Sequence, residues 1–241
     1  MDRIKKRLFG QMGIEVSEIG FGAWPIGGSH YGDVPESDGI QAIETYLAAG
    51  GNHIDTARGY GRSEMLVGQV LKNIDRDSIF LASKTIKGDG PDTIPEIRQE
   101  LEESLRQLQT DYLDLYYLHL PPDDIESMQR ALDEFEALQR EGKIKYIGAS
   151  IKAADVTPAT LQLCHQYIAA GRVNALQVVY SILRQLHTGM FDDAVQNGVA
   201  IIARTASEKT LRPFMLTYPS CGCMGMRNTC PSSPFAESTG R

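Results

Sequence analysis

Residues 112–150, YLDLYYLHLPPDDIESMQRALDEFEALQREGKIKYIGAS, contain the pattern that decides the fold. Residues 112–119 and 144–150 are short and mostly apolar, which is typical of buried strands. Between them, residues 125–140 carry apolar side chains at helical spacing and are followed by Gly142, a residue type that often terminates a helix. The stretch therefore predicts a strand, a helix and a second strand parallel to the first.

The same alternation extends in both directions along the chain. Ser63 is placed to cap one of the expected helices, and Thr93 with Glu96 has the spacing of a capping box. The expected strands are residues 16–22, 52–56, 79–83, 112–119, 144–150, 175–181 and 199–203. The expected helices are residues 37–49, 63–71, 93–108, 125–140, 156–170 and 187–196.

Such alternation fits either an open doubly wound sheet or most of a (β/α)8 barrel. A barrel brings the ends of all its strands onto one rim, whereas an open sheet directs ligands to one switch point. The glycines of residues 20–24 do not continue into a dinucleotide-binding GxGxxG motif. Polar residues end successive strands, which favours a TIM-type (β/α)8 barrel, incomplete at its C-terminal end: Asp55, Lys84, His119, Ser150, Gln177 and Arg204.

The periodicity also predicts how the chain divides into domains. Residues 1–205 are expected to form the barrel, with a hairpin over residues 7–17 at its base. Residues 206–241 lose the periodicity and contain several prolines and serines, so they are expected to form an irregular tail. Residues 214–218 are a candidate for a short eighth strand.

The composition narrows the possible functions. Hydrophobic residues make up 42% and charged residues 23% of the chain, as in soluble globular proteins. A net charge of −7 argues against nonspecific binding to nucleic acid or anionic membranes. No apolar run approaches the about 18 residues of a membrane span, and no apolar stretch follows the basic residues 1–7. We therefore expect a cytoplasmic protein; its oligomeric state is not predicted.

Three of the four cysteines, Cys221, Cys223 and Cys230, lie close together near the C-terminus. Structural zinc usually has four ligands, and only His165 or His187 offers a fourth. Because neither histidine is predicted to lie nearby, we expect no metal site.

Three consecutive strands end in residues that carry chemistry. Residues 53–61 contain Asp55 and Tyr60, and the next two strands end in Lys84 and His119. Taken singly, a loop tyrosine is usually a packing residue, a strand-end lysine is usually solvated, and a histidine among apolar residues usually belongs to the core. The combination on adjacent strands instead predicts one site.

Reduction of a carbonyl explains why these residue types would meet. The carbonyl oxygen gains negative charge as hydride arrives at carbon, so a proton donor must lie beside it. A lysine cation makes a neighbouring tyrosine a better acid, a carboxylate holds the lysine, and a histidine can donate a hydrogen bond to the oxygen. The predicted roles are general acid for Tyr60, activator for Lys84, partner of the lysine for Asp55 and orienting donor for His119. A Schiff-base role for Lys84 is the alternative, although Asp55 would keep this lysine charged.

Together these segments resemble the active site of the aldo-keto reductases, and residues 20–24 are similar to that family's first strand and loop. The resemblance extends over residues 7–205. It implies an enzyme that reduces small aldehydes and ketones with NADP(H) or, as the alternative cofactor, NAD(H), and that binds neither nucleic acid nor membrane.

The resemblance also implies a cofactor site. A serine and a glutamine of the family hold the nicotinamide carboxamide, and Ser150 and Gln177 match them, but Ile151 stands where asparagine is usual. Arg204 replaces an aromatic residue that stacks on the nicotinamide, and Trp24 would wall the substrate pocket. Ordinary polar or aromatic rim residues are the alternative at these positions. The implied cofactor-binding residues are Gly22, Ala23, Asp55, Ser150, Gln177 and Arg204.

The C-terminal part departs most from the family. Relatives grip the adenosine phosphate with basic residues after the seventh barrel strand, where this chain has only Lys209 and Arg212 nearby. We therefore expect weaker cofactor binding and little preference for NADPH over NADH. A truncated, non-catalytic relative that serves as a binding or scaffold subunit is the alternative function.

Overall fold

A computed structural model describes most of the chain before residue 207. The described residues up to Ala206 form one compact unit. None of the helices within them is long and apolar enough to cross a membrane. The predicted tail, its candidate strand over residues 214–218 and its three cysteines lie outside the described part. The described residues are 3–28, 32, 34–88, 90, 92–151 and 156–206.

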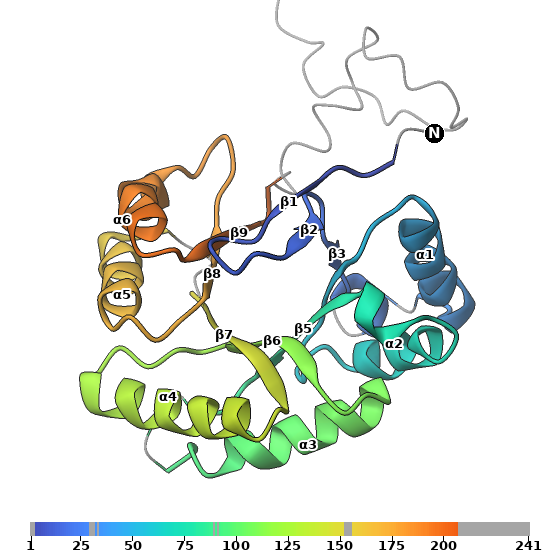
Figure 1. Ribbon diagram of the computed structural model, residues 1–241, viewed down its shortest axis with the longest axis horizontal. Helices are drawn as coiled ribbons and strands as arrows, with labels where there is room; N and C mark the ends of the chain where they lie inside the picture. The colour runs from blue at the N-terminus through green and yellow to red at the C-terminus, as the bar shows by residue number, and fades with distance from the viewer. Residues whose placement is uncertain are drawn as a thin grey trace, which may run out of the picture. The chain divides into compact units, whose positions relative to one another are not determined.

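Seven parallel strands form one sheet whose order follows the chain. The sheet curls into an arc that has the helices on its outer side (Figure 1). This arrangement confirms the predicted α/β fold of the (β/α)8 type; within the described residues, β3 and β9 form its two edges. The strands are β3 (Phe21–Gly22), β4 (His53–Asp55), β5 (Phe80–Thr85), β6 (Leu113–Leu118), β7 (Ile144–Ser150), β8 (Ala175–Val179) and β9 (Ala200–Arg204).

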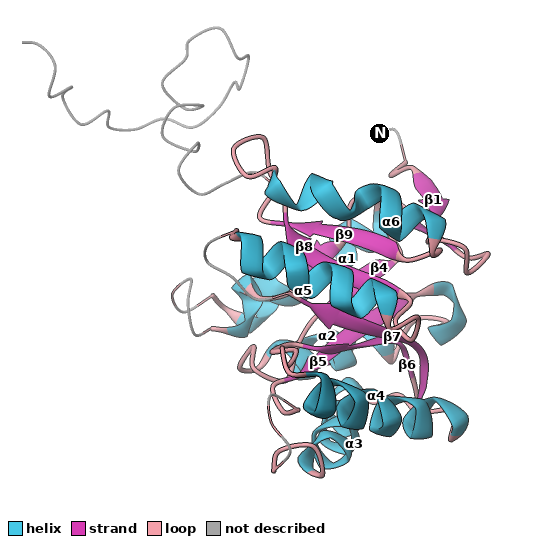
Figure 2. Cartoon of the chain, turned by 90° about the vertical axis from the view of Figure 1, so that its left-hand side faces the viewer, coloured by secondary structure: helices cyan, strands magenta, loops and turns pink. Residues whose placement is uncertain are grey.

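Amphipathic helices connect the strands. In the fourth helix, Leu132 and Phe135 are buried, and the Asp124 side chain caps the first turn by accepting a hydrogen bond of 2.7 Å from the Ser127 amide. Figure 2 shows α5 and α6 on the outer face of the last strands. The helices are α1 (Glu36–Ala48), α2 (Ser63–Leu71), α3 (Glu96–Leu108), α4 (Ile125–Arg140), α5 (Pro158–Ala169) and α6 (Phe191–Gln196), with 3-10 turns η1 (Pro25–Gly27), η2 (Arg76–Ser78) and η3 (Leu186–Met190).

Alternate strand residues point to opposite faces of the sheet and so form two separate cores. The outward residues, such as Leu81 and Tyr116, pack against the helices. The inward residues Ala82 and Ala175 pack inside the arc. The same alternation places the predicted site residues of the strands on the inward face, near the C-terminal ends: Asp55, Lys84, Ser150, Gln177 and Arg204.

A hairpin lies at the N-terminal end of these strands. Strand β1 (Lys6–Leu8) pairs antiparallel with β2 (Glu15–Ser17). The Phe9 ring packs against the Phe80 ring, with 4.8 Å between their centres. The single strand predicted over residues 16–22 is wrong, because β2 pairs within the hairpin while β3 pairs with β4 in the main sheet.

Both predicted helix caps are also wrong. The Ser63 hydroxyl contacts the Thr56 hydroxyl and donates to the Ala23 carbonyl at 2.9 Å, and Arg62 occupies the N-cap position. The Thr93 hydroxyl donates to a loop carbonyl at 2.9 Å, and α3 begins three residues later. Tertiary and loop acceptors therefore take the hydroxyls that the local pattern assigned to helix ends.

Close packing of α2 against α3 generates a stability prediction. A Cβ atom at Gly68 would lie 2.2 Å from the backbone oxygen of Gln107 in α3. Alanine normally stabilises a helix relative to glycine by about 1 kcal/mol. Here we expect Gly68→Ala to lower the free energy of unfolding by ~1–3 kcal/mol, because the helices must move apart. Urea denaturation measures this change.

The half-buried Gln69 on the same helix provides the control. Gln69→Ala should change the free energy of unfolding by less than ~0.5 kcal/mol. A Gly68→Ala protein as stable as the wild type would show that this contact does not limit the packing of α2.

Candidate active site

The centre of the site is the side chain of Lys84, which β5 carries into the interior of the arc. Lys84 has no exposed surface. Its ammonium is ion-paired with Asp55 at the end of the neighbouring strand β4, and it donates a hydrogen bond of 2.7 Å to the Thr56 carbonyl. A buried cation needs such partners, because removing it from water costs several kcal/mol. The strand register thus places Lys84 and Asp55 together as predicted.

Tyr60 lies beside this ion pair in the loop after β4. The Lys84 ammonium is 5.1 Å from the centre of the Tyr60 ring. The His119 ring meets the Tyr60 ring edge-on, with 5.7 Å between centres, and the Trp24 ring lies 6.4 Å away. The structure therefore brings the four predicted catalytic residues and Trp24 together; their chemical roles remain a prediction.

Two glycines allow the loop of Tyr60 to pack closely. A Cβ atom at Gly27 would lie 2.0 Å from the Tyr60 carbonyl oxygen. Gly61 has a φ of 58°, a conformation that favours glycine. The segment that carries Trp24 can therefore lie directly against the loop that carries Tyr60.

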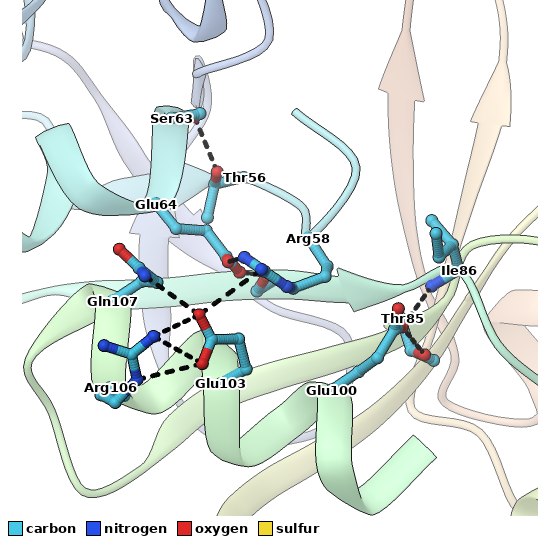
Figure 3. A network of polar contacts seen from close by, with 11 residues as sticks. Thr56, Arg58, Ser63, Glu64, Thr85, Ile86, Glu100, Glu103, Arg106 and Gln107 are labelled. Atoms are coloured by element: carbon cyan, nitrogen blue, oxygen red, sulfur yellow. Dashed lines mark hydrogen bonds and ion pairs between the residues drawn. The ribbon is translucent and has the colours of Figure 1, made fainter. Parts of the chain in front are cut away.

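A polar network on the outer face of the sheet holds the same loop (Figure 3). The Arg58 amide donates to the Lys84 carbonyl at 3.1 Å. Its guanidinium pairs with Glu64 at 3.1 Å and with Glu103 at 3.5 Å. Glu64 is almost fully buried and accepts a second bond, of 2.7 Å, from the Ser83 hydroxyl. Arg58, two residues before Tyr60, thereby joins the loop after β4 to α2, α3 and β5.

Arg58 and Glu64 were not among the predicted site residues. The available signal was a carboxylate among the apolar residues of α2, close to Leu66 and Val67. A charge at a buried helical position requires a partner, and Arg58 was the nearest cation on the preceding loop apart from Arg62.

The two residues predicted to hold the nicotinamide carboxamide contact each other. Ser150 and Gln177 are register partners on β7 and β8. The Ser150 hydroxyl donates to the Gln177 side-chain oxygen at 3.0 Å. The Gln177 side-chain amide donates to Asp55 Oδ2 at 2.9 Å. The predicted cofactor residues and the predicted catalytic residues are therefore linked directly.

The remaining predicted cofactor residues lie around Asp55. Gly22 is its register partner on β3, and the Ala23 amide donates to its carbonyl at 2.8 Å. Arg204, at the end of β9, donates to the Ile151 carbonyl at 3.1 Å. Burial lowers the pKa of Arg204, and the nearby Tyr60 and Asp55 oppose this shift. A guanidinium therefore faces the site from the last described strand.

Tyr117 lies beneath the lysine and was also not singled out. Its ring centre is 5.5 Å from the Lys84 ammonium, and its side chain is fully buried. Burial raises the pKa of Tyr117 well above its usual value, so the phenol stays neutral. Gly148 makes room for the ring, since a Cβ atom there would lie 2.5 Å from it. The signal was the strand alternation, which pairs Tyr117 with Lys84 in register.

No group of three or more histidine, cysteine, aspartate or glutamate side chains is placed to hold a metal ion within the described residues. His165 pairs with Asp193, and His187 is buried against the Val179 carbonyl and Thr160. The tail cysteines lie outside the described residues.

Comparison with known proteins identifies relatives of the whole barrel region. The sequence profile described as "Aldo/keto reductase family" matches residues 18–212. Aldo-keto reductase YhdN of Bacillus subtilis is 39% identical over 147 residues, which are 57% of this chain and 44% of that protein. NADH-specific methylglyoxal reductase of Escherichia coli is 31% identical over 243 residues, which are 89% of this chain and 71% of that protein. The match to YhdN thus spans less than half of its length.

The fold is shared with a solved structure of a related enzyme. An aldo-keto reductase of Bacillus halodurans in its holo form superimposes with a TM-score of 0.72 at 28% sequence identity. The match covers 94% of this chain and 73% of that chain. The profile match over most of the chain and the E. coli relative agree with this fold. The chain therefore belongs to the aldo/keto reductase family.

Proposed function

We propose that this protein is an oxidoreductase that reduces aldehydes or ketones to alcohols with NADP(H) or, as the alternative cofactor, NAD(H). Members of its family are oxidoreductases that typically use these cofactors. One observation carries the proposal: a fully buried lysine, held by Asp55, lies beside the ring of Tyr60. That arrangement places a cation beside a phenol that would become negatively charged as it gives up its proton.

Each of three side chains has one role in the proposed reaction. When bound, the reduced nicotinamide supplies the hydride that reaches the carbonyl carbon. Tyr60 donates its phenolic proton to the carbonyl oxygen, so the product is a neutral alcohol. The Lys84 charge stabilises the phenolate that remains, and His119 orients the carbonyl oxygen by a hydrogen bond.

The polar groups at the rim fit a nicotinamide in part. Ser150 and Gln177 would hold its carboxamide, and the guanidinium plane of Arg204 would stack on its ring. The Ile151 side chain is fully buried and apolar, so it offers no third carboxamide contact. This observation supports the alternative, a non-catalytic relative that acts as a binding or scaffold subunit.

The contacts of Lys84 argue against a Schiff-base enzyme. A lysine that attacks a carbonyl must be neutral and free to move. Here the ammonium is ion-paired with Asp55 and hydrogen-bonded to the Thr56 carbonyl, so it is not free to move.

Replacing Tyr60 by phenylalanine tests the proposed proton donor. We expect Tyr60→Phe to lower kcat at least ~10²-fold with an aldehyde substrate, because a positioned acid is lost. Cofactor affinity should change little, since the phenol is not proposed to contact the cofactor. Steady-state rates of NADPH oxidation and quenching of Trp24, the single tryptophan, measure the two quantities.

Tyr112→Phe is the matched control. Tyr112 precedes β6, at the end of this strand opposite to the site, and its hydroxyl donates a hydrogen bond to Asp77. Its turnover should match the wild type. Unchanged turnover in Tyr60→Phe would refute the role of Tyr60, and a wild type that binds cofactor but reduces no carbonyl would favour the scaffold alternative.

Cofactor selectivity gives a second test. The 241-residue chain should bind NADPH and NADH with dissociation constants within about tenfold of each other. The reason is that few cations follow β9 closely in the sequence, where they could bind a 2′-phosphate. Two charge-assisted contacts at ~1.5–3 kcal/mol each would instead make the dissociation constant for NADPH at least ~10²-fold lower than that for NADH. Titration of Trp24 fluorescence with each cofactor distinguishes these outcomes. Strong discrimination against NADH would mean that Lys209 and Arg212 form a phosphate site.

A further inference from the structure

The two carboxylate oxygens of Asp55 have different partners. Oδ1 pairs with the Lys84 ammonium, and Oδ2 accepts a hydrogen bond of 2.9 Å from the Gln177 side-chain amide. Asp55 ends β4 and Gln177 lies in β8, with β5, β6 and β7 between these strands in the sheet. The contact therefore crosses the interior of the arc and does not follow the strand pairing.

The chemistry of the contacts defines the orientation of the Gln177 amide. Its carbonyl oxygen would repel the Asp55 carboxylate, so the NH2 group must face Asp55 and the oxygen must face Ser150. The Ser150 hydroxyl accordingly donates to that oxygen at 3.0 Å. Side chains of Ser150 and Gln177 are both buried, which makes each of these bonds costly to lose.

Asp55 needs a second contact to hold its orientation. The terminal torsion of an aspartate is soft, so a carboxylate can rotate about it at little cost. An ion pair at Oδ1 alone leaves this rotation free. The bond from Gln177 to Oδ2 restrains this rotation and with it the oxygen that pairs with the Lys84 ammonium.

We propose that Gln177 is a positioning residue, which acts on Tyr60 through Asp55 and Lys84 in addition to any contact with cofactor. The inference rests on the proposed function of the site. The two roles use different atoms, since the NH2 group binds Asp55 and the side-chain oxygen retains an acceptor position for a carboxamide.

Other charged and titratable groups also face Asp55 and must stay constant in any test. They lie on its own strand, on the loop that follows it and on three other strands, β5, β6 and β9. These groups are His53, Tyr60, Lys84, Tyr117 and Arg204. Comparisons at one pH between variants of Gln177 leave all of them in place.

Two substitutions of Gln177 distinguish its role in positioning Asp55 from its contact with the cofactor, because the two roles predict a different ranking of the variants in kcat. Gln177→Glu preserves the shape and an acceptor oxygen for a carboxamide, but it sets a like charge against Asp55. Gln177→Met removes both hydrogen bonds without adding charge. We expect kcat at saturating NADPH to fall about tenfold in Gln177→Met and further in Gln177→Glu. Turnover of Gln177→Glu equal to or above that of Gln177→Met would overturn the proposal.

A double-mutant cycle with Asp55→Asn shows whether Gln177 acts through Asp55. If it does, Gln177→Met should lower kcat less than about threefold further in the Asp55→Asn background. Losses that multiply in the double variant would mean that Gln177 acts on the cofactor alone, and the proposal would fail.

Unfolding of the same four proteins without cofactor supplies a readout that does not depend on activity. A bond between Gln177 and Asp55 predicts a coupling of about tenfold in the unfolding equilibrium constant, or ~1.4 kcal/mol. Absence of coupling overturns the inference, whether or not the wild type turns over. A wild type that shows this coupling but reduces no carbonyl would refute the proposed function and not the contact.

Discussion

The buried charge of Lys84 is the constraint on which the site depends. An ammonium without access to water requires an anion and hydrogen-bond acceptors at short range. Asp55 at the end of β4 and the carbonyl of the next residue, Thr56, supply them. Asp55 in turn is held by Gln177 from the far side of the arc. The loop that carries Tyr60 is tied to the backbone of Lys84 by Arg58. Each of these contacts is made either by Lys84 itself or by its partner Asp55.

Much of the fold could be predicted because local periodicity and tertiary packing agree. The predicted helix over residues 125–140 and the strand over 144–150 match α4 and β7, since their apolar spacing is also their buried face. The predictions are wrong where a partner that is distant in the sequence determines the local structure. Ser63 binds Ala23 and does not cap α2, and residues 16–22 divide because their two halves pair with different segments.

The candidate site was predictable to the extent that parallel strands end on one rim. Asp55, Lys84 and His119 could be grouped because their strands are consecutive in the chain and therefore adjacent in the sheet. The bond between Asp55 and Gln177 could not be predicted, because it depends on the curvature that brings β4 opposite β8. The second partner of Glu64 could not be predicted either, since Ser83 lies on β5, a separate strand.

The hairpin at the base of the arc has a consequence for how the chain is made. Its turn lies against the start of β9, where the Gln11 amide bonds to the Gly198 carbonyl at 3.4 Å, while Phe9 packs on Phe80. The hairpin leaves the ribosome before the strands of the main sheet, yet its contact at residue 198 is translated only after β8. Contacts between segments so far apart in sequence form slowly. The base of the arc is therefore completed only after residue 198 has been translated, and until then the Gln11 amide lacks this acceptor.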